Sequence, residues 1–150
     1  MIKPFHIHLT KSQIASVSSD IRDIIASGSS VLGKHTEQLQ DCVAKTANKN
    51  YGVTVSSGTV ALECLFEFLR DYRQVKRVGV QSNTNFATVS AVVRAGLEVV
   101  FVDCDRNGQI DTKDIFSDSC DIKVDALAVV HIGGYISESI EQIKSSCESR

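Results

Sequence analysis

A glycine flanked by hydroxyl residues stands where a β-branched stretch runs into a helical pattern. The run Ser56–Thr59 follows Tyr51–Val55 and leads into an apolar helical repeat. A helix start leaves backbone N–H groups unpaired and carries the positive end of the helix dipole, so this junction could bind phosphate. Gly58 would admit the anion close to the backbone, and Thr59 would add a hydroxyl. The alternative is an ordinary N-cap, the usual role of Ser and Thr before a helix.

The oxygen-rich stretch Asp103–Asp114 is a second candidate site, because it matches the spacing of an EF-hand calcium loop. Three features oppose calcium. The preceding residues 99–102 have the pattern of a strand, Asp114 replaces the usual bidentate glutamate, and the chain holds no second loop of this kind. The competing interpretation, which we favour, is a polar turn after a strand followed by a helix N-cap.

Histidines provide weaker candidates. His131 follows an apolar strand pattern and precedes two glycines, and ligands of open α/β sheets bind at the carboxyl ends of strands. A structural hydrogen bond is its alternative role. His6 and His8 alternate along an extended stretch and could share a metal, but no third ligand accompanies them.

Alternating helices and strands would position these residues. A capping box at Thr10 and Gln13 predicts a helix that ends at Gly28, and a second helix is expected from about Thr36. Strands separated by crossover helices predict an α/β fold with a mostly parallel sheet. The expected strands are Tyr51–Val55, Arg77–Gln81, Leu97–Val102 and Asp125–Val130, and the expected helices between and after them are Val60–Tyr72, Phe86–Ala95, Thr112–Phe116 and Ser137–Cys147.

Apolar spacing also predicts which side chains are buried. The pattern of Leu97–Val102, apolar except for Glu98, is typical of a buried parallel strand. None of the five cysteines forms a Cys-x-x-Cys pair, so we expect reduced thiols that mostly fill the core. The helical residues expected inside are Leu39, Val43 and Ala47 in the second helix, and Leu62, Leu65, Phe66 and Leu69 in the third.

Composition bounds the class of protein. The 150 residues suit one domain, with leading helices in 1–50 and alternating strands and helices in 51–150. A net charge of −2 gives no reason to expect nucleic acid or an anionic membrane as partner. The apolar runs fall short of the roughly twenty residues that span a bilayer. With no secretory signal at the start, we expect a cytoplasmic protein.

Taken in order, these segments resemble the DegT/DnrJ/StrS family of sugar aminotransferases, which adopt the type I fold of pyridoxal-phosphate enzymes. The matching runs are Ser56–Leu62, Ser82–Thr88, Val99–Asp103 and Val129–Gly134. The resemblance implies that the chain is the amino-terminal portion of one large domain, whose parallel sheet with crossover helices is incomplete here.

The resemblance also implies roles for single residues. Gly58 and Thr59 fall where members of the family hold the phosphate of pyridoxal phosphate. Asn85 falls where the family usually has an aromatic side chain stacked on the pyridine ring, and Phe86 comes one position later. Either Asn85 contacts the ring through its amide face or the loop is offset.

The resemblance implies that the intact enzyme transfers an amino group from glutamate to a nucleotide-linked keto-sugar, in polysaccharide or natural-product synthesis. It also implies that the enzyme is a homodimer. Dehydration of the sugar with the same cofactor is equally open. The family's Schiff-base lysine and its aspartate are expected beyond Arg150, so no catalytic residue is assigned and the chain alone is expected to be inactive. The alternative is a non-catalytic product of a truncated or split gene that acts only through association.

Overall fold

The computed structural model describes residues 7–111, 113–116 and 123–148. The chain divides into two compact units, Met1–Thr54 and Val55–Arg150. No helix in the described part of the chain is long and apolar enough to cross a membrane.

The first unit contains two helices, α1 (Lys11–Ser27) and α2 (Lys34–Thr46). The predicted capping box is present at the start of α1. The Thr10 hydroxyl accepts from the Gln13 amide at 3.3 Å, and the Gln13 side chain accepts from the Thr10 amide at 2.8 Å. The helix ends at Gly28, whose φ of 69° lies in the left-handed region that favours glycine. Both predicted boundaries of α1 are confirmed.

The predicted burial of α2 is wrong. Leu39 and Val43 are 54% and 53% exposed, Ala47 is the exposed C-cap, and Ala44 is the buried residue of the helix. No residue of α1 is buried. A unit of two helices is too small to bury the apolar side chains of both, since the fraction of surface that a domain buries rises with its size.

The predicted strand Tyr51–Val55 is also wrong, because the structure has no strand there. The segment lies against α2 instead. The Gln40 side-chain amide donates to the Thr54 hydroxyl at 3.1 Å, and a Cβ on Gly52 would come within 2.5 Å of the Gln40 carbonyl oxygen. A strand requires a hydrogen-bonded neighbour, and none of the described strands pairs with this segment.

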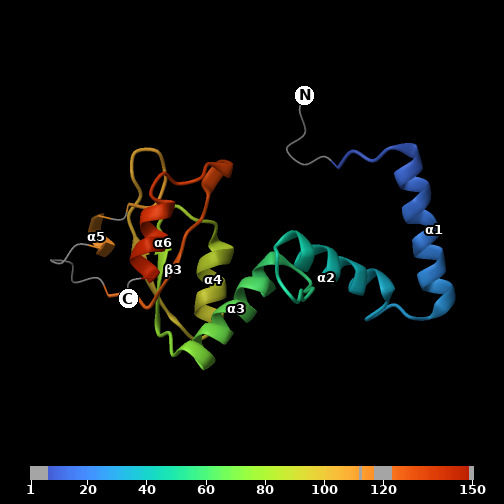
Figure 1. The fold of residues 1–150 in the computed structure, drawn as a ribbon, viewed down its shortest axis with the longest axis horizontal. Coiled ribbons are helices and arrows are strands. Elements are labelled where there is room, and N and C mark those ends of the chain that lie inside the picture. The colour runs from blue at the N-terminus through green and yellow to red at the C-terminus, as the bar shows by residue number, and fades with distance from the viewer. Residues whose placement is uncertain (1–6, 112, 117–122, 149–150) are drawn as a thin grey trace. The chain divides into compact units, whose positions relative to one another are not determined.

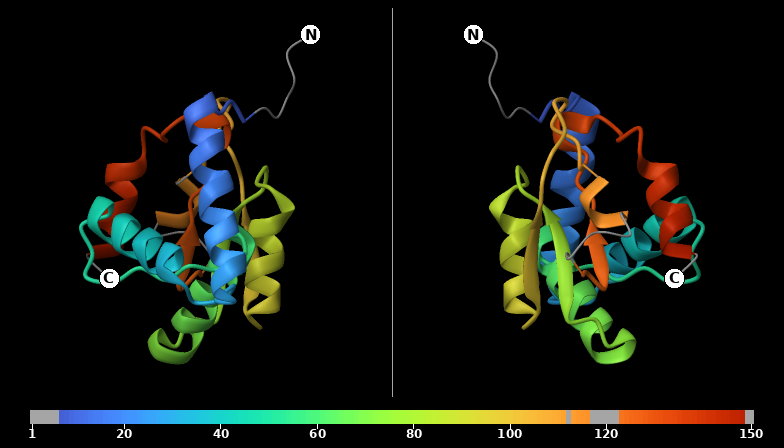
Figure 2. Two further views of the ribbon diagram at one scale, coloured as in Figure 1. Left: turned by 90° about the vertical axis from the view of Figure 1, so that its right-hand side faces the viewer. Right: turned by 90° about the vertical axis from the view of Figure 1, so that its left-hand side faces the viewer.

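The second unit contains the predicted parallel sheet, which is confirmed (Figure 1). Its strands are β1 (Arg77–Gln81), β2 (Glu98–Val102) and β3 (Ala126–Ala128), in the order β2-β1-β3, and both pairings are parallel. Figure 2 shows the strands beside the helices that connect them. The helical elements are α3 (Gly58–Arg73), α4 (Phe86–Arg94), α5 (Lys113–Phe116), the 3₁₀ turn Ile132–Gly134 and α6 (Ile140–Glu148).

The core of the second unit surrounds the central strand β1. Val78 and Val80 are fully buried there, together with Phe66 of α3. Two burial predictions are wrong in part. Leu65 is 50% exposed, and Phe101 of β2 is 58% exposed. β2 is an edge strand of the sheet, with a neighbouring strand on one side only.

Helices α3 and α4 pack on one another and on this core. Arg70 of α3 donates to the carbonyl of Ala95, the C-cap of α4. Arg94 at the end of α4 pairs with Glu63 of α3 at 3.0 Å. These contacts fix the C-terminal end of α4 against α3, while the N-terminal end of α4 lies where β1 ends.

Candidate functional site

The start of α3 has the geometry that an anion site needs. Ser57 is the N-cap, with an extended backbone, and its hydroxyl accepts from the Val60 amide at 3.3 Å. Its carbonyl accepts from the Ala61 amide at 3.0 Å. The backbone N–H groups of Gly58 and Thr59 have no acceptor among the hydrogen bonds of the described residues. The N-cap and the anion site are therefore compatible, because they use different amides.

The surface around these two residues is open. A Cβ added at Gly58 would meet no heavy atom within 4 Å, and Gly58 itself is exposed. Thr59 is partly exposed and carries a hydroxyl on the first turn. An open approach, two unpaired donors and the positive helix end together suit a phosphate group.

The start of α4 carries the other two predicted site residues. Asn85 is the N-cap, and its side-chain oxygen accepts from the Ala87 amide at 2.9 Å. Phe86 is the first residue of the helix and is 80% exposed. The cap bond fixes the Asn85 amide plane, and the exposed ring lies one residue later. No described interaction joins the start of α4 to the start of α3, so the structure places the two pairs in one unit without direct contact.

A buried glutamine at the carboxyl end of β1 was missed by sequence reasoning. Gln81 is fully buried. Its side-chain nitrogen donates to the Asn83 side-chain oxygen at 2.7 Å and to the Gly108 carbonyl at 2.9 Å, and its side-chain oxygen accepts from the Val130 amide at 3.4 Å. The available signal was one polar residue closing the apolar strand that contains Val78 and Val80.

The oxygen-rich loop after β2 is a hairpin turn. Cys104 and Ile110 form an antiparallel bridge across it. One carboxylate oxygen of Asp105 accepts from the amides of Asn107 and Gln109, at 2.8 and 2.9 Å. The competing interpretation of a polar turn is confirmed, since this carboxylate serves the turn itself. Among the described residues, no three His, Cys, Asp or Glu side chains are grouped to hold a metal ion.

His131 is exposed three residues beyond the end of β3, at the N-cap of the 3₁₀ turn. His6 lies outside the described residues. The expectation that cysteines mostly fill the core is wrong, because three of the described ones are exposed: Cys42, Cys64 and Cys147. Cys104 is half-buried, and Cys120 lies outside the described residues.

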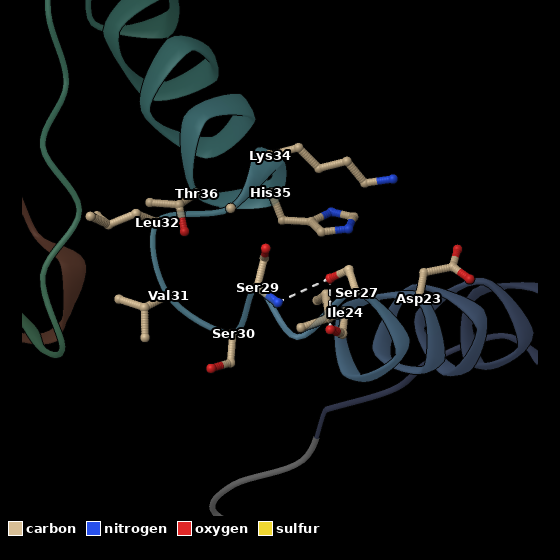
Figure 3. A pocket seen from close by; sticks show the side chains of 11 residues that line it. Asp23, Ile24, Ser27, Ser29, Ser30, Val31, Leu32, Lys34, His35 and Thr36 are labelled. Carbon is tan, nitrogen blue, oxygen red and sulfur yellow. Dashed lines mark hydrogen bonds between the residues drawn. The ribbon is translucent and has the colours of Figure 1, made fainter.

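An open pocket of about 510 Å³, with a mixed polar and apolar lining, lies in the first unit between the end of α1 and the start of α2 (Figure 3). Ser27 and Ser29 line it, and the Ser29 amide donates to the Ser27 hydroxyl at 3.1 Å. Lys34 and His35 contribute side chains from the first turn of α2, whose N-cap Gly33 offers no side chain. Sequence reasoning missed this pocket, because the loop that forms it has no motif of its own.

The fold and site define a class of protein. The second unit is an α/β segment with a small parallel sheet, helices between its strands and an open helix start, and it corresponds to part of a type I pyridoxal-phosphate transferase large domain. The model of the DegT/DnrJ/EryC1/StrS aminotransferase family matches residues 12–150. The chain belongs to this family.

Individual relatives are similar over a fraction of their own length. The chain is 27% identical over 138 residues to the UDP-4-amino-4,6-dideoxy-N-acetyl-beta-L-altrosamine transaminase of Campylobacter jejuni subsp. jejuni serotype O:23/36 (strain 81-176), covering 89% of this chain and 35% of that protein.

Two solved structures share the fold. Helicobacter pylori PseC, an aminotransferase involved in the biosynthesis of pseudoaminic acid, superposes with a TM-score of 0.75 at 17% identity, over 95% of this chain and 37% of that one. A GDP-4-keto-6-deoxymannose-3-dehydratase with a trapped PLP-glutamate geminal diamine gives 0.73 at 23% identity, over 89% and 36%. The chain thus spans little more than a third of the length of these relatives.

Proposed function

We propose that this chain is the cofactor-binding segment of a pyridoxal-phosphate-dependent aminotransferase that acts on nucleotide-linked keto-sugars. The intact enzyme would use glutamate as the amino donor and would be a homodimer. The observation that carries the proposal is the pair of unpaired amides at Gly58 and Thr59, in a chain that belongs to a family of aminotransferases. Dehydration of the same class of sugar is the alternative reaction, since one structural relative is a dehydratase.

The residues present fit the cofactor. The amides of Gly58 and Thr59 would hold its phosphate, aided by the positive end of α3. Asn85 and Phe86 would lie against its ring, with the Asn85 side chain held in place by its bond to the Ala87 amide. When bound, the cofactor supplies an electron sink for charge that develops on the substrate.

The proposal assigns no lysine of these 150 residues to covalent attachment of the cofactor, and no aspartate to its pyridine nitrogen. The lysine and the aspartate that the family uses for these two roles lie outside the motifs that this chain shares with the family. The segment by itself is therefore proposed to bind the phosphorylated cofactor without turning over substrate. The covalent anchor, the sugar site and the whole reaction belong to the proposal for the intact enzyme.

Replacing Gly58 by proline tests the proposal at one atom. Proline is well tolerated at the first position of a helix and removes the N–H there, and the extended backbone of Ser57 suits a residue before proline. We expect Gly58→Pro to weaken binding of pyridoxamine 5′-phosphate about tenfold or more, because a hydrogen bond to a charged group contributes about 1.5–3 kcal/mol. Isothermal titration calorimetry on the 150-residue chain measures this.

The matched control is Gly58→Ala, which keeps the N–H and adds a methyl group that meets nothing within 4 Å. Its affinity for the ester should stay well above that of Gly58→Pro, because the N–H is kept. Pyridoxamine without the phosphate should bind far more weakly than its phosphate ester. Equal affinity of the wild type for the two ligands, or of Gly58→Pro and Gly58→Ala for the ester, would overturn the assignment of the phosphate site.

A further inference from the structure

The loop between β1 and α4 has to place Asn85 and Phe86, and it is four residues long, Ser82–Asn85. The Ser82 amide donates to the Val102 carbonyl at 2.9 Å, which ties the first residue of the loop to β2. The Thr84 amide donates to the Gln81 carbonyl at 3.1 Å. In the middle of the loop, Asn83 is also held by the side chain of Gln81.

Gln81 connects the segments that follow all three strands. Asn83 lies in the loop after β1, Gly108 in the hairpin after β2, and Val130 after β3. The side-chain amide of Gln81 bonds to each of them. The Asn83 side chain also donates to the Gly108 carbonyl at 2.9 Å, which closes a ring of bonds among Gln81, Asn83 and Gly108.

The arrangement leaves little freedom at these positions. A buried amide is costly unless its donors and acceptor are bonded, and here all three bonds are made inside the protein. Gly108 has a φ of +72°, and a Cβ at this position would come within 3.2 Å of the Asn83 side-chain nitrogen. The hairpin therefore approaches the loop as closely as a glycine permits.

We propose that Gln81 is a positioning residue, which holds the Ser82–Asn85 loop so that Asn85 and Phe86 lie against the ring of the cofactor. The inference rests on the proposed function, because it assigns a role in binding the same cofactor. Gln81 is fully buried and its side-chain amide is bonded within the protein, so we assign it no contact with the ring. It acts through Asn83, two residues before the N-cap of α4.

A positioning role and a purely structural role predict different results. A structural role would lower stability and weaken every ligand together. A positioning role affects only the part of the affinity that the ring supplies, because the phosphate amides belong to α3 and make no bond to Gln81. The informative quantity is the ratio of the affinities for pyridoxamine 5′-phosphate and for inorganic phosphate.

The test variant is Gln81→Met, which keeps an unbranched side chain of similar length and removes all three bonds. The control is Val78→Ala, which opens a cavity in the same strand away from the loop. We expect Gln81→Met to lower the affinity ratio about three- to tenfold, the worth of a typical hydrogen bond, with phosphate affinity nearly unchanged. Val78→Ala should leave the ratio as in the wild type. Calorimetry with both ligands gives the ratio.

Amide hydrogen exchange on the ligand-free chain gives a second readout. The Thr84 and Ala87 amides, which report the order of the loop and of the Asn85 cap, should lose protection in Gln81→Met and keep it in Val78→Ala. If Gln81→Met does not fold, Asn83→Ala removes one partner at an exposed position and should shift the ratio in the same direction.

The outcomes separate the two claims. An unchanged ratio and unchanged exchange in Gln81→Met overturn the positioning role and leave the phosphate site intact. A parallel loss of affinity for both ligands means a structural role and also overturns it. A wild type that binds pyridoxamine 5′-phosphate no better than inorganic phosphate refutes the ring contact of the proposed function, and the role of Gln81 fails with it.

Discussion

At the scale of single residues, Asp125 shows how one carboxylate fixes one end of a sheet. One of its oxygens accepts from the amides of Lys76 and Arg77, each at 2.8 Å, at the end of the sheet where β1 begins. These two hydrogen bonds, that from the Lys76 amide most and that from the Arg77 amide next, hold the pKa of the Asp125 carboxyl below its ordinary value. The charged form of Asp125 therefore stabilises the junction between β1 and β3.

This shift predicts how stability depends on pH. Because the pKa of Asp125 is lower in the folded state than in the unfolded state, its contribution is present above the ordinary carboxyl pKa and is lost as the pH falls through the folded value. We expect Asp125→Asn to lower the urea midpoint at about pH 7 and the difference from wild type to shrink at about pH 3. Urea unfolding followed by circular dichroism measures both.

Asp71 provides the control. The pKa of its carboxyl is also lowered, by the hydrogen bond from Arg70, but both partners are exposed and such pairs contribute little. Asp71→Asn should therefore change the midpoint less than Asp125→Asn. A loss in Asp125→Asn that is equally large in acid and at neutral pH would refute the linkage.

At the scale of the elements, Gly79 of the central strand leaves room for side chains that pack over the sheet. A Cβ at this position would come within 2.7 Å of a terminal methyl of Leu127, and within 3.3 Å of Val124. We expect Gly79→Ala to cost about 1–3 kcal/mol of unfolding free energy, because extra volume in a packed core forces side chains to move. Urea unfolding of the variant measures the cost.

A double-mutant cycle checks the cause. If the added methyl group is opposed by Leu127, then Leu127→Ala should cost less in the Gly79→Ala background than in the wild type. Gly58→Ala, whose new methyl group meets nothing within 4 Å, serves as the comparison for a glycine in open space. Additive effects of the two core substitutions would show that the strain lies elsewhere.

The elements also show what the sequence could predict. The start and stop of α1 followed from local chemistry, the capping box at Thr10 and the left-handed turn at Gly28. The boundaries of β1 followed from its apolar pattern. Tyr51–Val55 has an equally suitable composition and is not a strand, because pairing depends on a distant neighbour that a local pattern does not reveal.

The same division applies to the candidate site. The helix start at Phe86 was predicted at the observed residue, and the start of α3 was predicted at Val60, two residues after the observed start at Gly58. Ser57 and Asn85 cap their own helices, so both starts leave a local signal in the sequence. The role of Gln81 was not predicted, because its partners Gly108 and Val130 lie 27 and 49 residues away. Contacts of that separation depend on the order of the strands, which no local pattern specifies.

At the scale of the whole molecule, the proposed homodimer can be tested on α1. Several of its apolar side chains at helical spacing remain about half-exposed, among them Ile14, Val17 and Ile21 at 51%, 48% and 50%. Exposed apolar area of this kind is typical of an interaction surface. We expect the chain to sediment as a dimer, and the double substitution Val17→Glu and Ile21→Glu to shift it toward monomer.

Ser19→Glu is the control, since it adds charge to the opposite side of the same helix. It should leave the sedimentation coefficient unchanged. Sedimentation velocity at several concentrations separates a defined dimer from aggregate. A wild type that stays monomeric throughout, or a dimer insensitive to charge at Val17 and Ile21, would refute self-association through α1.

The cap at the start of α3 has a consequence for how this segment can change over time. The Ser57 hydroxyl caps α3 by accepting from the Val60 amide, so the amides of Gly58 and Thr59 make no hydrogen bond that stabilises the helix. The stability of the helix and the binding of an anion thus depend on separate atoms, and a substitution can change one without the other. A related sequence could therefore bind a different anion at this helix start, or bind none, and still keep the same fold.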